Sequence, residues 1–479
     1  GERPPYVETK FTPDGKVKPT TTAATPGAKR AVPAVGQLTA LDFPTITHTT
    51  LANGLAVDYA QRTAVPITQL AVTFNAGDAA DLPTARGVQA LMLGMLEEGT
   101  TSLDAQAYSE AKERLGVEID TTSSLDRSTV TMSALSANLA PSLALVGDVI
   151  KNPAFAPADL ARVKTQSLTS IAQLQKDPNG IAARALPALI FGPSHPYAAL
   201  RGGESAAIGA ASRDQLIVYR DRWIRPDNAK IFIVSDRPLA ELMPLLNAQF
   251  GSWSAPSVAR GVKTFGAIPA RPATSRIVLI DRPGSPQSVI SGGQITPLDP
   301  KSDILAVSSA NDVLGGDFLS RINLDLRESK GWSYGVNGNL ALRERAVPYL
   351  INAPVQADRT GDAIAALDTQ FAGFLGPRGV TPEELARVTA NSINELPGRF
   401  ETSSAVLAAM MSNDLLGRPD DYYETLATRY RGQTPAAVDQ AIRAAVSQRG
   451  FVWLVVGDAA KVRPQLAKLG LPIEVIPAR

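Results

Sequence analysis

The amino-acid sequence predicts an α+β fold made of two related halves, and two observations support this prediction. Short apolar segments of strand length alternate along the chain with longer segments of helical periodicity. The alternation then restarts after the strand-like AKIFIVSD (229–236): RIVLIDRPGSPQSVISG (276–292) is again strand-like, helices and strands follow, and FVWLVVGD (451–458) ends the run. An order of elements that repeats indicates an internal duplication.

Two pairs of similar segments give this duplication a nearly constant offset. Leu-Ala-Arg-Val stands at 160–163 and again at 385–388, which is an offset of 225 residues. IFIVSD ends at Asp236 and WLVVGD ends at Asp458, which is an offset of 222 residues. Two matches in almost the same register favour related halves. The alternative is a pair of unrelated α+β domains with similar helix and strand endings.

The individual elements follow from local patterns. In the first half, LAVDYAQ (55–61), ITQLAVTFNAG (67–77) and STVTMSALSANL (128–139) predict strands. LDAQAYSEAKERLG (103–116) predicts a helix, and long helices are expected up to about residue 223. In the second half, Thr381 and Glu384 have the spacing of a capping box, and Pro382 suits the first helical position. A helix is therefore expected to begin at this point.

The domain organisation follows from changes in composition. Residues 1–40 are rich in Pro, Thr, Ala and Lys and lack periodicity, which predicts a flexible N-terminal arm. We expect a first α+β domain at 41–255 and a second at 276–479. Between them, residues 256–275 gather Pro, Gly and Ser and are expected to form a linker.

Composition and charge exclude several classes of function. The 479 residues include 47 Lys and Arg against 46 Asp and Glu, so the net charge of +1 gives no electrostatic reason to expect a nucleic-acid partner. No apolar run reaches the 18 or more residues of a membrane helix, so no membrane span is expected. The absence of cysteine excludes disulfides, thiolate metal ligands and cysteine nucleophiles. The chain begins GERPPYVETK without Met. We expect an exported protein whose targeting segment has been removed, or else a start chosen artificially at this point.

Common hydrolytic motifs are missing from the sequence. Its two histidines, His48 and His195, lie far apart, and neither has a second His four residues on. Because a zinc hydrolase needs about three clustered ligands, we expect a structural role for each histidine. The sequence also lacks the G-x-S-x-G of serine hydrolases and the phosphate-binding G-x-x-x-x-G-K-[ST].

The segment ARGVQALMLGMLEEGT (85–100) predicts an amphipathic helix with an unusual second face. Its apolar stripe is formed by Val88, Leu91, Met92, Met95 and Leu96. The other face carries Ala90, Leu93 and Gly94, although a Gly inside a helix costs about 1 kcal/mol relative to Ala.

This segment resembles the zinc helix of the pitrilysin-like metallopeptidases, which are zincins with an inverted motif and include mitochondrial processing peptidase and insulin-degrading enzyme. Their pattern is G-x-x-H-x-x-E-H-x-x-x-x-G-T, and three positions keep its frame: Gly87, Gly99 and Thr100. The first His, the base Glu and the second His of the pattern are replaced by Ala90, Leu93 and Gly94. The third ligand of the family, a Glu on a later helix, is expected within residues 159–178, where no carboxylate lies between Asp159 and Asp177. The resemblance therefore implies that the helix is kept and that this chain binds no metal.

The resemblance extends from about residue 45 to the end of the chain. It includes LANGLAVDYAQ (51–61), which is similar to the opening hairpin of the family, and YRDRWIRPDNAKIFIVSD (219–236), which is similar to the end of its first domain. IDRPGSPQSVI (280–290) is similar to the start of the second domain. The implied fold has two homologous units, each a mixed, mainly antiparallel sheet covered by helices, which together form half of a clamshell.

A further match concerns the second half. LGGDFLSRINLDLRESKGWSYGV (314–336) resembles the family segment in which an Arg and a Tyr, seven positions apart, project into the catalytic chamber; Arg327 and Tyr334 have this spacing. A guanidinium can hold a substrate carbonyl, and a phenol hydroxyl can donate to a developing oxyanion. Without the resemblance, the residues alone would favour a surface ion pair for Arg327 and a half-buried position on a strand for Tyr334.

Together these features imply a zinc-free subunit of a heterodimeric endopeptidase. It would supply Arg327 and Tyr334 and half of a peptide chamber to a homologous catalytic subunit with an intact H-x-x-E-H, which would hold the zinc. The expected substrate is a peptide or an unfolded protein segment, and the expected compartment is the bacterial periplasm. Two alternatives remain open: an inert scaffold or peptide-binding subunit of the same fold, and a metal-free homodimer that binds peptides.

Overall fold

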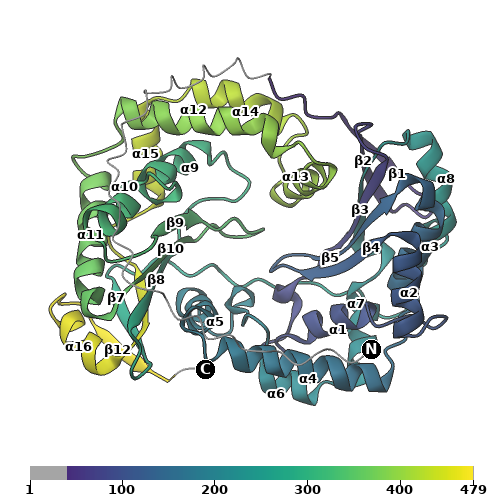
Figure 1. Ribbon diagram of the computed structural model, residues 1–479, viewed down its shortest axis with the longest axis horizontal. Coiled ribbons are helices and arrows are strands. Elements are labelled where there is room, and N and C mark those ends of the chain that lie inside the picture. The colour runs from purple at the N-terminus through teal and green to yellow at the C-terminus, as the bar shows by residue number, and fades with distance from the viewer. Residues whose placement is uncertain (1–39, 478–479) are drawn as a thin grey trace, which may run out of the picture. The chain divides into compact units, whose positions relative to one another are not determined.

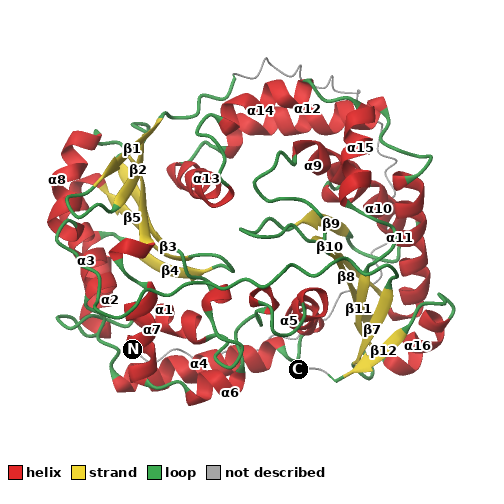
Figure 2. Ribbon diagram, turned by 180° about the vertical axis from the view of Figure 1, so that it is seen from behind, coloured by secondary structure: helices red, strands yellow, loops and turns green. Residues whose placement is uncertain are grey.

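The computed structural model describes residues 40–477, so almost all of the N-terminal arm expected at 1–40 lies outside the described residues. Each half of the described chain contains one six-stranded sheet with helices packed on it. Figure 2 shows the two sheets as separate groups of strands. The predicted α+β fold with two homologous units is confirmed.

The first sheet is mixed and mainly antiparallel. Its strands stand in the order β1-β2-β6-β3-β5-β4, and only the pairing of β2 with β6 is parallel. Their bounds are β1 Ile46–Thr50, β2 Ala56–Gln61, β3 Ile67–Phe74, β4 Glu118–Ser123, β5 Ser128–Leu135 and β6 Ala229–Ser235. The edge strand β4 was not predicted from the sequence, because Ile119 is its only apolar residue.

The second sheet repeats this arrangement. Its order is β12-β7-β11-β8-β10-β9, so β7, β11, β8, β10 and β9 take the places of β2, β6, β3, β5 and β4. Their bounds are β7 Arg276–Asp281, β8 Gln287–Gln294, β9 Asn337–Leu340, β10 Tyr349–Gln356, β11 Val452–Gly457 and β12 Ile473–Ile476. The same strand order in both halves is the structural form of the duplication that the 225-residue and 222-residue offsets indicated. The halves differ in the outermost strand, since β1 pairs antiparallel to β2 whereas β12 pairs parallel to β7.

Helices follow the strands in each half (Figure 1). Those of the first half are α1 Val88–Leu96, α2 Ala105–Leu115, α3 Leu139–Lys151, α4 Pro157–Leu174, α5 Pro178–Phe191, α6 Ser205–Ala210, α7 Arg213–Trp223 and α8 Leu239–Phe250. Those of the second half are α9 Leu305–Asn311, α10 Arg321–Asn323, α11 Thr360–Leu375, α12 Pro382–Arg399, α13 Ser403–Leu416, α14 Tyr422–Arg431, α15 Pro435–Ala445 and α16 Ala459–Ala467. Thr381 and Glu384 form the predicted capping box at the start of α12.

Each half places one helix on the sheet of the other half. On β6, Ile231 and Ile233 belong to the core of the first half, whereas Phe232 and Val234 pack with residues of α13. Successive side chains of a strand point to opposite faces, so α13 covers the second face of the first sheet. In the same way, α5 of the first half packs on β8 and β11 of the second sheet. Figure 1 shows both helices against the sheet of the other half.

This exchange explains the sequence of the central strands. Strands β6 and β11 are buried on both faces, and such strands carry continuous apolar runs rather than an alternating pattern, here 231–234 in β6 and 452–456 in β11. Residues 251–275, between α8 and β7, form no helix or strand. Within the described residues, no helix has the length and hydropathy required to cross a membrane.

Candidate functional site

Helix α1 has the buried stripe that the sequence predicted: Val88, Leu91, Met92, Met95 and Leu96 are all buried. The helix begins after Gly87, which has a left-handed conformation with φ of 92°. A carboxylate caps this end, since Asp81 accepts hydrogen bonds from the backbone N–H groups of Gly87 at 2.6 Å and Gln89 at 3.1 Å. Burial raises the pKa of Asp81 to about 7. The start of α1 is therefore fixed by hydrogen bonds to the side chain of Asp81.

The three positions that carry zinc ligands and base in the resembling pattern lie together on α1. Ala90, Leu93 and Gly94 line a cavity of about 330 Å³ between α1, strand β4 and helix α4. Leu93 is only 2% exposed, and a Cβ placed on Gly94 would stand 3.8 Å from the Val163 side chain of α4. The positions that resembled a metal site thus surround a small cavity lined largely by apolar and neutral side chains.

The donors around this cavity do not fit a zinc ion. Its carboxylates are Glu97 and Glu98, and both already have partners. Glu97 accepts hydrogen bonds from the backbone N–H and the hydroxyl of Thr121, each at 2.6 Å, and Glu98 pairs with Arg162. Residues 40–477 contain no cluster of three or more His, Cys, Asp or Glu that could hold a metal ion. Zinc requires about four such ligands, or three and a water molecule, so no hydrolytic step can be assigned to a metal of this chain.

Arg327 lies in a π-helical segment, Leu324–Ser329, that directly follows α10. Its guanidinium stands over the ring of Phe318, with the guanidinium carbon 4.4 Å from the ring centroid. Its Nε lies 3.4 Å from a carboxylate oxygen of Glu328, and about one third of its side chain is exposed. Short π-helical segments are rare and are frequently found at functional sites. The guanidinium is thus placed by an aromatic surface and keeps exposed N–H donors.

Tyr334 lies just before β9, the edge strand of the second sheet. Its side chain is 89% exposed, and its hydroxyl makes no hydrogen bond within the described part of the chain. Tyr334 is therefore not a half-buried strand residue, which was the structural alternative for it. A large aromatic side chain held in water at such an exposure is available to a ligand or a partner.

A set of hydrogen bonds fixes the backbone on both sides of these two residues. The buried amide of Asn323 donates to the carbonyl of Phe318 at 2.7 Å, and its oxygen accepts from the N–H of Val336 at 3.0 Å. The hydroxyl of Ser333 donates to the carbonyl of Pro354 on β10 at 2.6 Å. Asn323 thereby connects the loop at Phe318 to Val336, the residue just before β9. The backbone that carries Arg327 and Tyr334 is therefore fixed on both sides by hydrogen bonds.

The structure does not bring all the sequence-predicted residues together. Arg327 and Tyr334 share one segment of the second half, whereas the cavity at Ala90, Leu93 and Gly94 is lined only by residues of the first half. This separation agrees with a chain in which the Arg/Tyr segment is not aimed at a metal of its own α1.

Two family models match consecutive parts of the chain. The model described as Insulinase (Peptidase family M16) matches residues 57–196, and the model described as Peptidase M16 inactive domain matches residues 210–391. The chain belongs to the M16 peptidase family. This is the family that the pitrilysin-like resemblance indicated.

Curated relatives support the M16 assignment across most of the chain. A protein of Mycobacterium leprae named an uncharacterized zinc protease is 23% identical over 353 residues, which cover 73% of this chain and 77% of the relative. A Helicobacter pylori protein named non-peptidase homolog YmxG is 21% identical over 443 residues, which cover 89% of this chain and 98% of the relative. Similar M16 chains thus carry both kinds of name.

Solved structures share the M16 fold. A crystal structure of a peptidase M16 inactive domain from Pseudomonas fluorescens has a TM-score of 0.78 and 24% identity, and the match covers 86% of this chain and 98% of that one. The periplasmic protease PqqL from Escherichia coli has a TM-score of 0.70 and 16% identity. The match covers 92% of this chain but 52% of PqqL, so the M16 chain described here spans about half of that protein.

The two histidines of this M16 chain have the structural roles expected of them. His195 is buried beside the ring of Phe191, its Nδ1 accepts a hydrogen bond from the N–H of Tyr197 at 3.0 Å, and burial lowers its pKa. His48 lies within β1. Its ring contacts Asp58 at 2.7 Å and Asp420 at 2.8 Å, and these hydrogen bonds, that to Asp58 most, raise its pKa. The contact with Asp420 joins residues 372 positions apart in the sequence.

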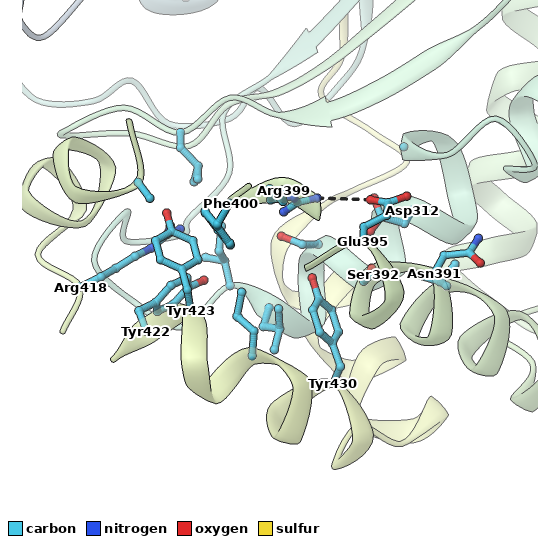
Figure 3. A pocket seen from close by; sticks show the side chains of 18 of the residues that line it. Asp312, Asn391, Ser392, Glu395, Arg399, Phe400, Arg418, Tyr422, Tyr423 and Tyr430 are labelled. Atoms are coloured by element: carbon cyan, nitrogen blue, oxygen red, sulfur yellow. Dashed lines mark ion pairs between the residues drawn. The ribbon is translucent and has the colours of Figure 1, made fainter. Parts of the chain in front are cut away.

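A second group of polar residues, which was not predicted from the sequence, lines a cavity of about 730 Å³ in the second half (Figure 3). The cavity lies among α9, α12, α13 and α14. Its titratable residues are far apart in the sequence, from Asp312 to Tyr430, and no short motif connects them. An observation that could have drawn attention to it is Asp312 itself, the single charged residue of the helical segment 305–316.

Proposed function

We propose that this chain is the zinc-free subunit of a heterodimeric M16 endopeptidase. It would contribute Arg327, Tyr334 and half of the peptide chamber, while a homologous partner with an intact H-x-x-E-H would hold the zinc. One observation supports this division most strongly. The side chains around the cavity at α1 do not fit zinc, yet Arg327 and Tyr334 are exposed on a backbone that hydrogen bonds hold in place.

The geometry at Tyr334 and Arg327 suits the stabilisation of a developing charge. A phenol hydroxyl with no partner in the described chain is free to donate to the oxyanion that forms when water attacks a peptide carbonyl. The guanidinium of Arg327, supported by Phe318, is a fixed donor for a substrate carbonyl. Donors that are placed in advance cost little reorganisation during the reaction, so they stabilise the transition state more than the bound substrate.

The neighbouring strand suits an extended peptide. Strand β9 pairs with β10 on one side and has no second strand partner among the described residues. Apart from the carbonyl of Gly338, which accepts a hydrogen bond from the amide of Asn311 at 2.9 Å, its outer backbone groups can pair with an added strand, and this mode of binding recognises the backbone more than the side chains. Broad specificity for peptides or unfolded segments would follow.

The proposed compartment is the bacterial periplasm. This part of the proposal rests on the fold shared with the periplasmic protease PqqL. Since PqqL is about twice as long as the part matched here, one chain of that protein has room for two such units. A second unit for this chain would then come from a separate partner.

A catalytically inert scaffold or peptide-binding subunit is the second candidate. It is favoured by the similarity to the non-peptidase homolog of Helicobacter pylori. It predicts that replacing Arg327 and Tyr334 together by Ala leaves the function of the assembly unchanged, whereas the proposed function predicts a large loss of turnover. A metal-free homodimer is separated from both by the presence or absence of a second, different chain in the native protein.

Reconstitution tests the proposal. The chain and an M16 partner that keeps H-x-x-E-H, first of all one encoded by a neighbouring gene, are purified separately and mixed, and cleavage of quenched fluorogenic peptides is measured. We expect activity in the mixture, its loss on chelation of zinc, and its loss when the Glu of the partner's motif is replaced by Gln. Zinc-dependent cleavage by this chain alone would contradict the proposal.

A further inference from the structure

The cavity of about 730 Å³ in the second half has the features of a binding site. Figure 3 shows Phe400, Tyr422 and Tyr423 on the side of Arg418 and Glu395 beside Asp312, with Arg399 between the two groups and Tyr430 apart from the other rings. One of its walls is the π-helical segment Asp312–Gly316, and π-helical turns are common at functional sites. The only other π-helical segment within residues 40–477 carries Arg327.

The acidic end of the cavity contains a carboxyl with no partner. Asp312 makes neither an ion pair nor a side-chain hydrogen bond within the described residues, whereas Glu395 pairs with Arg399 at 3.5 Å. Burial raises the pKa of Asp312 to about 7. Asp317 and Glu395 raise it further, and Arg399 and Arg387 oppose them without making contact. No cation in contact therefore balances the charge of Asp312 when the carboxyl ionises.

The aromatic walls of the cavity suit a cation. Phe400 and Tyr423 pack with ring centroids 4.7 Å apart, and Tyr422 stands next to them with its ring 4.3 Å from the guanidinium carbon of Arg418. The chain itself thus places a guanidinium on one of these rings. Cations bind the faces of aromatic rings through the ring quadrupole, and more strongly when water is excluded.

The cavity lies next to the Arg/Tyr segment. Asp317 lines the cavity, and the next residue, Phe318, supports the guanidinium of Arg327. Leu342, two residues beyond the end of β9, is also part of the lining. A peptide bound along the outer edge of β9, which has no second strand partner among the described residues, would therefore pass close to both sites.

We propose that this cavity is a subsite for a cationic group of the peptide substrate, an ammonium or guanidinium that binds between the carboxyl of Asp312 and the aromatic walls. The proposal rests on the proposed function only in taking a peptide as the ligand. An anion is disfavoured at the Asp312 end, because Arg399 is already paired with Glu395 and Arg418 is stacked on Tyr422. A Lys or Arg side chain supplies the cation on a stem that apolar and aromatic walls can cover.

Binding of two matched peptides tests this subsite without any catalytic step. The probes are a fluorescein-labelled nonapeptide of small neutral residues with one central lysine and the same peptide with norleucine, which has a similar stem without the charge. Fluorescence anisotropy with the full chain at pH 8 should give a Kd at least about tenfold lower for lysine than for norleucine. The preference should shrink at pH 6, where Asp312 is mostly protonated.

Two substitutions assign the effect to the cavity. In Asp312→Asn, the preference for lysine should fall below about threefold and lose its pH dependence. Asp358→Asn is the matched control, because this carboxylate is 70% exposed and does not line the cavity, so the preference should be unchanged. Melting curves confirm that both variants are folded. Absence of a lysine preference in the unmodified chain, or its persistence in Asp312→Asn, would overturn the subsite.

The same assay separates this proposal from the proposed function. Tyr334→Phe should keep the preference for lysine even if it abolishes turnover in the reconstituted complex, because Tyr334 does not line the cavity. Conversely, a failed reconstitution with a retained lysine preference would leave the cavity as the binding site of a peptide-binding subunit.

Discussion

Replacement of Tyr334 by Phe separates catalysis from folding. The side chain is 89% exposed, and its hydroxyl makes no hydrogen bond in the described chain. Loss of that oxygen should therefore change the free energy of unfolding by less than about 0.5 kcal/mol. If the hydroxyl donates to the oxyanion of the transition state, its loss should raise the barrier by about 3–4 kcal/mol and lower kcat by about 10²–10³-fold.

Steady-state kinetics of the reconstituted complex measure this effect. KM should stay close to that of the unmodified complex, because the lost interaction forms only in the transition state. The amount of complex, measured by analytical ultracentrifugation, should also be unchanged. These two readings distinguish a lost donor from a weakened assembly.

The control removes a hydroxyl elsewhere. Tyr108 in α2 is 1% exposed, and its hydroxyl is buried with no hydrogen-bond partner. Tyr108→Phe should leave turnover unchanged and raise the free energy of unfolding by about 1 kcal/mol, because an unsatisfied buried group is removed. Turnover of the Tyr334→Phe complex equal to that of the Tyr108→Phe complex would refute the donor role.

Three further predictions concern stability and metal binding. The pKa of Asp312 is raised from 3.8 to about 7, so ionisation of this carboxyl destabilises the fold from about pH 4 upward. Asp312→Asn should therefore increase the free energy of unfolding by up to about 4 kcal/mol at pH 8 and by almost nothing at pH 3.5. Urea unfolding at the two pH values measures this difference. The pKa of His48 is raised above 6.5, so the stability that its protonated ring contributes is present at low pH and is lost as the pH rises through the folded-state pKa. His48→Gln should therefore lower the melting temperature at pH 5.5 but leave it unchanged at pH 8.5. The combined change Ala90→His, Gly94→His and Gln166→Glu places three ligands around the cavity at α1 and should create zinc binding that calorimetry can detect. Absence of zinc binding in this variant would mean that the cavity is not the remnant of a metal site.

Local patterns predicted those helices and strands whose own residues already favour the structure that the tertiary fold imposes on them. Strand β6 was recognised because a strand buried on both faces is continuously apolar, and the start of α12 because its capping residues act within a few positions. Strand β4 was missed, since it is an edge strand with one apolar residue, and pairing with β5 rather than its own composition makes it a strand.

Contacts between distant segments could not be predicted in the same way. The apolar residues of α13 show that the helix is buried, but not that it packs on the sheet of the other half. The contact of His48 with Asp420 and the cavity around Asp312 also depend on residues brought together only by the tertiary fold. The replaced motif positions on α1 and the pair Arg327 and Tyr334 were identified through their resemblance to family patterns, each of which lies within one short segment of the sequence. Their exposure and the support from Phe318 and Asn323 required the structure.

Metal analysis of the assembled peptidase tests the central claim most directly. Inductively coupled plasma mass spectrometry gives the zinc content of this chain alone, of its partner alone and of the purified complex. The account predicts about one zinc per heterodimer, all of it carried by the partner, and less than about 0.1 zinc per molecule of this chain after dialysis against micromolar zinc. A stoichiometric zinc ion retained by this chain on its own would contradict the account.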